Sequence, residues 1–221
     1  MKFLCVSDQI DPYLYSASVK ERFGDVDAVL SAGDLPDEYL DFLVSALNKP
    51  VYFVFGNHNL KSFNFYHNTR QCSKADYRLA HENFQGTGAT YIGCKCIRTD
   101  NVLIAGVSGS LRYNDGMSQY TERQMTAQLC RLIPSLLFNR IRYGRFLDIL
   151  VTHAAPFGIH DKEDPCHRGF KCFLRFIRWF KPKFLIHGHI HLYDLQDKRV
   201  SQCGPTTVIN AYGHYLIETG D

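Results

Sequence analysis

The stretch DAVLSAGDLPDEYLDFLVSALNKPVYFVFG, residues 27–56, decides the fold because strand, helix and strand patterns follow one another in it. Its two ends, 27–33 and 51–56, are apolar runs of strand length, and the second is rich in valine and aromatic residues. Between them a helix is expected at residues 37–47, where the apolar residues recur at the spacing of one helix face, at Leu40, Leu43, Val44 and Leu47. The order strand, helix, strand predicts parallel strands joined by a crossover helix.

Comparable patterns extend this arrangement in both directions along the chain. Further strands are expected at residues 2–6, 146–153 and 183–188, and helices at 119–143 and 170–180. Residues 89–99 and 101–109 have the pattern of a hairpin that turns at Asp100 and Asn101. Pro134 is expected to kink or break its helix. Two or three antiparallel strands are expected to close the chain by residue 219.

The bulk composition is that of an ordinary globular domain. The chain has 221 residues, of which 45% are hydrophobic and 21% are charged, so we expect residues 1–221 to form a single domain. A net charge of +3 is too small to indicate nucleic acid or an anionic membrane by itself. No stretch approaches the roughly 18 apolar residues of a membrane span.

The N-terminus and the cysteines favour a cytoplasmic protein. The apolar run at the start ends at Val6, which is too early for a signal peptide. The eight cysteines are therefore expected to be free thiols in a reducing compartment. Cys94 and Cys96 form a C-x-C pair, but no second pair follows at the spacing of a zinc site, so a cysteine metal site is disfavoured.

Polar side chains that can bind metal follow the predicted strands one after another. They are Asp8, Asp34, Asn57, His58, His153, His189 and His191. In open α/β sheets, sites form outside the carboxyl ends of the strands, so these loops are expected to meet. Oxygen and imidazole ligands without thiolate suit Mn, Fe or Zn rather than a structural cysteine–zinc site. A glycine precedes several of them and allows an unusual turn or a close approach.

Each of these residues alone has an ordinary structural explanation. Asp8 could be a turn or cap residue, Asp34 could cap the helix that begins near Pro36, and His153 could be a buried histidine with a hydrogen-bond partner. Their recurrence after five separate strands is what predicts a shared metal site. His189 and His191 alternate along an extended segment and so point to one face.

The order of these residues resembles that of the calcineurin-like metallophosphoesterase superfamily. The family pattern runs D-x-H, G-D-x-x-D, G-N-H-D/E, a lone histidine after a strand, and G-H-x-H. The matching residues here are Asp8, the segments GDLPD (33–37) and GNHN (56–59), His153 and GHIH (188–191). The match runs from residue 6 to residue 191. Each motif is weak alone, but all five in order are highly specific.

The resemblance implies an α/β fold, a four-layer α-β-β-α sandwich of two mixed sheets flanked by helices. It implies two divalent metal ions (Mn, Fe, Ni or Zn, with Mn favoured). Asp34 would bridge them, Asn57, His153 and His189 would complete one site, and Asp8 and His191 would hold the other. The implied activity is hydrolysis of a small or nucleotide-like phosphodiester by a metal-activated hydroxide, with His58 as general acid.

Two positions depart from the family pattern. Ile10 stands where D-x-H has its histidine, so the first metal site is expected to be weaker or differently selective. Asp11 could substitute as a ligand, although an Asp-Pro turn is the favoured interpretation. Asn59 replaces an acid that often lies beside the catalytic histidine. It could still orient the ring of His58, and Asp37 could supply the missing charge.

Residues outside the motifs are candidates for substrate binding. Arg112 and Tyr113 lie in a glycine-rich turn, where they could grip a phosphate and stack on a base or belong to an ordinary loop. His160 and His167 lie in a long polar loop after His153 and could line the pocket or face solvent. The basic helix at 170–180 could contact a membrane or nucleic acid, but a surface helix with its aromatic face in the core is favoured.

Other functions stay open on this sequence. The same fold could act on phosphomonoesters or nucleic acid, although nucleases of the family usually carry extra domains and this chain leaves no room for one. It could also be a catalytically silent scaffold, as the retromer subunit of this fold shows, and Ile10 gives that alternative some weight. The expected partner is a small-molecule phosphoester, with no membrane and with a homo-oligomer possible. The intact His58 favours an enzyme.

Overall fold

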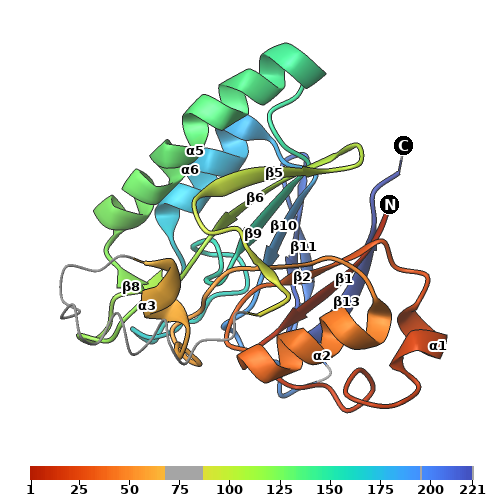
Figure 1. Cartoon of the computed structure of the whole chain (residues 1–221). Helices are drawn as coiled ribbons and strands as arrows, with labels where there is room; N and C mark the ends of the chain where they lie inside the picture. The colour runs from red at the N-terminus through yellow and green to blue at the C-terminus, as the bar shows by residue number, and fades with distance from the viewer. Residues whose placement is uncertain (68–86, 195, 221) are drawn as a thin grey trace.

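Two mixed β-sheets face each other in the computed structural model, which describes residues 1–67, 87–194 and 196–220 (Figure 1). The first sheet has the order β13-β1-β2-β3-β4, and the second has the order β11-β12-β10-β9-β6-β5. The strands of the first sheet are β1 (Lys2–Ser7), β2 (Ala28–Ser31), β3 (Val51–Phe53), β4 (Thr90–Tyr91) and β13 (Gly213–Glu218). Those of the second are β5 (Lys95–Thr99), β6 (Val102–Val107), β9 (Ile149–Thr152), β10 (Phe184–His187), β11 (Val200–Cys203) and β12 (Thr206–Asn210).

Parallel pairing dominates both sheets, and antiparallel strands occupy their edges. In the first sheet β1 to β4 run parallel, and β13 pairs antiparallel with β1. In the second sheet β6, β9, β10 and β12 run parallel, while β5 and β11 pair antiparallel at the two edges. The strand–helix–strand stretch at residues 27–56 therefore forms the parallel unit that its pattern predicts.

Helices cover the outer face of each sheet, which makes four layers (Figure 1). The first sheet packs against α1 (Val19–Phe23) and α2 (Asp37–Leu47), with the short α3 (Phe63–Tyr66) beside them. The second sheet packs against α5 (Glu122–Tyr143) and α6 (Lys171–Phe180). Apolar side chains of both sheets fill the space between them, among them Phe3, Leu30, Ile104 and Ile186. The predicted four-layer α/β sandwich is confirmed.

Several predicted elements agree with the structure in detail. The helix α2 begins and ends at the predicted residues and buries Leu40, Leu43 and Leu47. The strands β5 and β6 form the predicted antiparallel hairpin, with Asp100 in the left-handed conformation at the turn. The aromatic face of α6 lies in the core, as favoured, because Phe173 and Phe176 are buried.

Of the kink or break expected at Pro134, the break does not occur, because α5 runs through this residue as one helix of 22 residues. Pro134 is exposed, while Leu132 and Leu136 on either side of it are buried against the sheet. The helix also begins later than predicted. Thr121 accepts a hydrogen bond from the Gln124 amide, and the Gln124 side chain accepts one from the Thr121 amide, which defines the first turn.

Two further boundaries differ from the prediction. The expected strand at 89–99 divides into β4 and β5, because Cys94 adopts a left-handed backbone at φ 55° and turns the chain from one sheet to the other. The closing strands are not all antiparallel, since β12 runs parallel to β10. A small pair, β7 (Ser110–Leu111) and β8 (Gln119–Tyr120), precedes α5, and β8 takes up the first two residues of the predicted helix.

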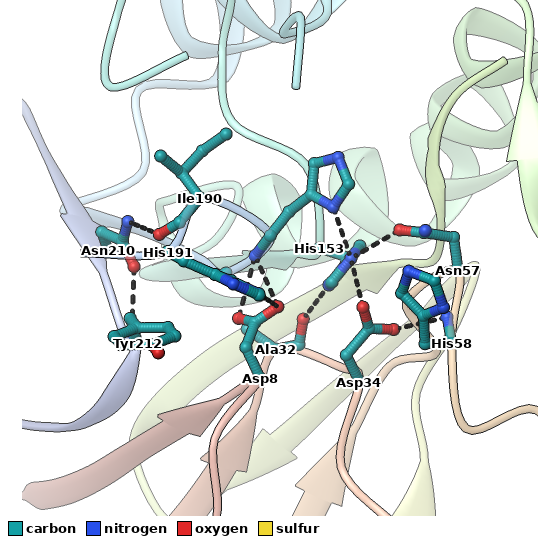
Figure 2. A network of polar contacts seen from close by, with 12 residues as sticks. Asp8, Ala32, Asp34, Asn57, His58, His153, Ile190, His191, Asn210 and Tyr212 are labelled. Carbon is teal, nitrogen blue, oxygen red and sulfur yellow. Dashed lines mark hydrogen bonds and ion pairs between the residues drawn. The ribbon is translucent and has the colours of Figure 1, made fainter. Parts of the chain in front are cut away.

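The described helices include none that is long and apolar enough to cross a membrane. The seven cysteines within the described ranges are all free thiols. The carboxyl ends of β1, β2 and β3 from one sheet and of β9 and β10 from the other lie at one edge of the sandwich (Figures 1 and 2). The residues that follow those ends form the site described next.

Candidate metal centre

Five loops from the two sheets bring the predicted ligands to one place (Figure 2). Asp8 follows β1, Asp34 follows β2, Asn57 follows β3, His153 follows β9, and His189 follows β10. The backbone amide of Asp8 donates a hydrogen bond to the carbonyl of Gly33, and that of Gly188 donates one to the carbonyl of His153. Neighbouring loops are therefore tied together before any ligand is considered.

His153 lies at the centre of the first ligand group and is almost completely buried. Its Nε2 atom is 3.3 Å from Oδ2 of Asp34, 3.0 Å from Oδ1 of Asn57 and 3.2 Å from Nδ1 of His189. The ligand atoms of Asp34, His153 and His189 all lie within 4.8 Å of one another. One carboxylate, one amide oxygen and two imidazoles thus converge on a single point.

In each of these side chains, the polar atom that points away from the centre has a hydrogen-bond partner. That partner determines whether the atom that points toward the centre donates or accepts a hydrogen bond. Nδ1 of His153 is 2.8 Å from the carbonyl of Ala32, and Nε2 of His189 is 2.6 Å from the carbonyl of Cys166. Carbonyls only accept, so both of these ring nitrogens donate. The Asn57 Nδ2 donates to the Tyr113 hydroxyl at 3.2 Å and leaves its oxygen facing inward. The inward-facing atoms other than His153 Nε2 are therefore acceptors.

A buried point that is surrounded by hydrogen-bond acceptors requires a positive charge. The residues present therefore fit a metal ion. Without metal, a proton on His153 Nε2 supplies that charge. Burial alone would lower the pKa of His153, but the Asp34 carboxylate, with help from Asp8, outweighs it and raises this pKa to about 9. Burial likewise opposes ionisation of Asp34, yet His153 holds the pKa of Asp34 below its usual range.

His189 is neutral, as a metal ligand must be. Burial lowers its pKa to about 3, and the charge on His153 acts in the same direction. A neutral His189 presents a lone pair on Nδ1 because its Nε2–H is committed to Cys166. The donor set of carboxylate, amide oxygen and imidazole suits Mn, Fe, Ni or Zn, in agreement with the sequence prediction.

Asp8 and His191 form a second and looser group beside the first. Oδ1 of Asp8 is 3.9 Å from Nε2 of His191, and both Asp8 oxygens accept from the His189 backbone amide at 3.0 and 2.9 Å. Burial raises the pKa of Asp8, and the neighbouring Asp34 raises it further. His191 is partly exposed, and its Nδ1 is 2.7 Å from the Tyr193 hydroxyl.

The backbone turns these side chains inward at a cost in strain. Asp8, Asp34 and His189 have φ values of 62°, 60° and 68°, a left-handed conformation that costs roughly 1–2 kcal/mol per residue outside glycine. A side chain on Gly188 would collide with the Asp8 carboxylate, and one on Gly56 would collide with that of Asp34. Glycine is thus required for close approach at these two positions, as the sequence suggested.

His58 lies at the exposed side of the centre, and its backbone amide donates to Oδ1 of Asp34 at 2.7 Å. The two side chains that were expected to assist it bond elsewhere. Asn59 donates from Nδ2 to the carbonyl of Asp34 at 2.8 Å, so it holds the loop rather than the imidazole ring. Asp37 accepts a hydrogen bond from the Ser62 hydroxyl at 3.0 Å.

Because Ile10 stands in place of a histidine, the group around Asp8 has one ligand fewer than the family pattern. The Asp11 side chain does not point toward the centre to replace it. Asp11 accepts from the Tyr13 amide at 2.8 Å, and its other oxygen is 2.6 Å from Nδ1 of His214 on β13. These contacts build the Asp-Pro turn that was the favoured interpretation. Ile10 itself is exposed.

The four predicted substrate residues occupy three different environments. Tyr113 reaches the centre, where its hydroxyl accepts a hydrogen bond from Asn57. Arg112 is exposed, contacts the carbonyl of Gln119 at 3.5 Å and lines a separate pocket of about 910 Å³. That pocket includes none of the predicted metal ligands, so the structure does not bring Arg112 to the centre.

The two histidines of the long loop lie closer to the centre. His160 is bonded through Nδ1 to Nε2 of His187 at 2.9 Å and through Nε2 to Ser201 at 2.8 Å. It lines a pocket of about 500 Å³ together with His191. His167 packs its ring 5.3 Å from that of His189, and its Nδ1 is 2.8 Å from Oδ1 of Asp164.

Sequence reasoning missed three parts of this region. His187 lies directly before the G-H-x-H motif, and it supports His160 from a fully buried position. The backbone carbonyl of Cys166 fixes the ring of His189, and a contact to the backbone cannot be predicted from the residue type. Asp164, Cys166 and His167 also form a compact, partly exposed group of metal-capable atoms. A cysteine-containing cluster therefore occurs here, whereas Cys94 donates its thiol to Gln128.

The chain is similar to known proteins in sequence and in fold. A family model described as calcineurin-like phosphoesterase matches residues 1–193. The UPF0046 protein K07C11.7 of Caenorhabditis elegans is 27% identical over 223 residues, which span 96% of this chain and 69% of that protein. The protein TT1561 of Thermus thermophilus superposes with a TM-score of 0.58 at 12% identity, covering 96% of this chain and 88% of that one. Another solved structure reaches a TM-score of 0.63 at 14% identity, with 98% and 94% coverage. At such identities the solved structures support the fold alone.

Asp8 and Asp11 provide a matched pair for testing the ligand set. We expect Asp8→Asn to lower the manganese bound per chain by about one ion, because that carboxylate faces the centre. Asp11→Asn should leave the metal content unchanged, because Asp11 is held by His214 and the Tyr13 amide. Elemental analysis after gel filtration measures both. Equal metal loss in the two variants would make Asp11 the replacement ligand.

Metal affinity should fall as the pH falls. The raised pKa of His153, about 9, means that its Nε2 proton is present below that pH and competes with the metal. Between pH 8 and 6.5 we expect the apparent affinity for Mn²⁺ to drop by about tenfold per pH unit, with about one proton released per ion. Calorimetry in two buffers of different ionisation enthalpy gives both quantities. An affinity independent of pH over this range would show that His153 is neutral without metal.

Proposed function

The chain belongs to the calcineurin-like phosphoesterase family, and from this premise we propose that it is a metal-dependent phosphodiesterase for small or nucleotide-like substrates. The observation that carries the proposal is the convergence of acceptors on Nε2 of His153. Packing alone gives no reason to place Asp34, Asn57 and His189 around one buried point. A divalent cation at that point gives all three side chains a partner.

Two groups of side chains would hold the ions. Asp34, Asn57, His153 and His189 form the better-defined site, and Asp8 with His191 form the second, which is looser and lacks the histidine that Ile10 replaces. When bound, two divalent ions supply positive charge for the phosphoryl oxygens and lower the pKa of water. Among Mn, Fe, Ni and Zn we favour Mn, because oxygen donors are well represented and thiolates are absent from both groups.

His58 is proposed as the general acid. It is exposed at the side of the centre that substrate must approach, and the bond from its amide to Asp34 fixes its backbone against the metal site. Its imidazole can then donate a proton to the leaving oxygen as the phosphorus–oxygen bond breaks. The same bond links the position of His58 to the carboxylate that would bridge the ions.

The pocket beside His191 supports a substrate with a second anionic group. Its two acids, Asp161 and Asp197, are both occupied by backbone amides of their own turns. Its two lysines, Lys162 and Lys198, are exposed. The two acids keep their charge, but their oxygens are turned to backbone amides. The exposed lysine ammonium groups are therefore the charged groups that an anion could contact, such as a phosphate one group removed from the scissile bond. His160 and Ser201 form its wall.

His167 and Tyr113 are proposed to assist in different ways. Asp164 holds Nδ1 of His167, while the His167 ring packs beside His189, so Nε2 is the atom left to contact a substrate oxygen. Tyr113 positions the Asn57 oxygen through its hydroxyl. The scaffold alternative rests on Ile10 alone, whereas the cluster around His153 and the exposed His58 favour catalysis.

Loss of His58 tests the proposed chemistry directly. We expect the manganese-loaded protein to hydrolyse bis(p-nitrophenyl) phosphate, and His58→Ala to reduce kcat by about 10²–10⁴-fold without changing the metal content. The loss should be larger for diphenyl phosphate, whose leaving group is poorer and needs the proton more. Spectrophotometric assays on both esters measure this contrast.

The wild-type protein serves as the reference in each metal. A metal-loaded wild type that turns over neither diesters nor monoesters in Mn, Fe, Ni or Zn would establish the scaffold alternative instead. A loss that is equal for the two esters would remove His58 from the role of general acid but leave the metal-dependent activity standing.

The lysines of the pocket test the substrate class. We expect a nucleoside 3′,5′-bisphosphate to inhibit hydrolysis of bis(p-nitrophenyl) phosphate more tightly than the matching 5′-monophosphate. The double variant Lys162→Gln/Lys198→Gln should lose about tenfold of that preference, which corresponds to about 1.4 kcal/mol for two partly screened charges. The KM for the diester, which carries no second anion, should not change. A preference that survives the double change would place the second anion elsewhere.

A further inference from the structure

The two outer helices of the second sheet expose large apolar side chains that the fold does not need. Leu137, Phe138 and Ile141 on α5 are 50%, 61% and 87% exposed, and Trp179 on α6 is 66% exposed. The two helices lie side by side on the same face of the sheet (Figure 1), and both contribute to one core beneath them. The two helices thus share one face of the sheet, and each of them exposes apolar side chains to solvent.

These residues are not a continuation of the core. The helix α5 already buries Leu129, Leu132 and Leu136, and α6 already buries Phe173, Phe176 and Ile177. Each helix thus has a complete apolar side toward the sheet. Leu137 and Ile141 are one turn apart on α5, so they form a second apolar side that faces water. Exposed apolar groups gathered in this way mark an interaction surface.

The charge around this surface is almost entirely positive. Apart from Arg131, which lines the separate pocket with Arg112, the helix α5 carries Arg123, Arg140 and Arg142 and one acid, and α6 carries Lys171, Arg175 and Arg178 with no acid. The one acid, Glu122, is already occupied, because its carboxylate accepts from the backbone amides of Lys171 and Cys172. The net charge of the whole chain is only +3, so this face is far more basic than the average surface.

This charge decides between the candidate partners. A second copy of the chain would bring the same arginines against these, and that repulsion disfavours a symmetric dimer here. An anionic bilayer offers negative headgroups for the arginines and an apolar layer for the exposed side chains. Tryptophan is also a residue that favours the boundary between water and lipid.

We propose that the outer face of α5 and α6, formed by Leu137, Phe138, Ile141 and Trp179 with its arginine rim, binds the surface of an anionic lipid bilayer. The helices lie on the bilayer rather than cross it, which agrees with the finding on the described helices. This revises the expectation of no membrane contact. The aromatic face of α6 is in the core, as favoured, but Trp179 lies outside it. The proposal is independent of the proposed phosphodiesterase activity.

Trp179 is the only tryptophan in the chain, so its fluorescence reports on this face alone. We expect a blue shift when the protein is mixed with vesicles of phosphatidylcholine and phosphatidylserine (roughly 7:3). Brominated acyl chains should quench it. Pure phosphatidylcholine should give a much smaller shift, and raised salt should reduce the effect, because the attraction is partly electrostatic.

Variants separate the apolar and charged contributions. The triple change Leu137→Ser/Phe138→Ser/Ile141→Ser should lower partitioning in vesicle sedimentation by about tenfold or more. Arg140→Gln/Arg175→Gln/Arg178→Gln should remove the preference for phosphatidylserine. The control is Tyr13→Ser/Tyr15→Ser, two exposed aromatic residues that precede α1 on the first sheet's side, and it should bind as the wild type does. Circular dichroism confirms that each variant is folded.

Three results would overturn the proposal. One is the absence of any shift with either vesicle. Another is binding to both lipids alike that the triple variant does not change. The third is a dimer, seen by light scattering, that the triple variant separates, because this would make a second copy the occupant of the face.

Discussion

Repulsion among buried acceptors around Nε2 of His153 is the constraint on which the site depends. Asp34, Asn57 and His189 all direct acceptor atoms at this nitrogen. In a low-dielectric interior such an arrangement is unfavourable unless a positive charge occupies it. The fold holds it in place through the strained backbone at Asp34 and His189 and through carbonyls that fix both imidazoles from behind. The strained backbone lowers stability locally, and it holds the ligands in the arrangement that a cation needs.

The same constraint explains why the two halves of the centre differ. In the group around His153, each ligand has a second partner that leaves it one orientation. The pair Asp8 and His191 has only the His189 amide and the Tyr193 hydroxyl as supports, and His191 is open to solvent. Ile10 removes the residue that would have tightened this side. We therefore expect the two ions to be held with unequal affinity.

How much of this could be predicted from the sequence depends on whether a feature is local. The bounds of α2 and the turn at Asp100 follow from spacing and turn chemistry within a few residues, and they agree with the structure. The meeting of ligands at one edge follows from strand order, because polar residues recur at strand ends. The pairing of the two sheets, in contrast, came from the family resemblance, since no periodicity reveals which strands are neighbours.

Where an expectation from the sequence was not met, a contact made in the folded chain explains the difference. Asn59 was assigned to the ring of His58, but the Asp34 carbonyl lies nearer to its amide. Pro134 predicts a break in the helix, yet packing of Leu132 and Leu136 holds the helix through it. In each case tertiary contact outweighed the local preference of the residue.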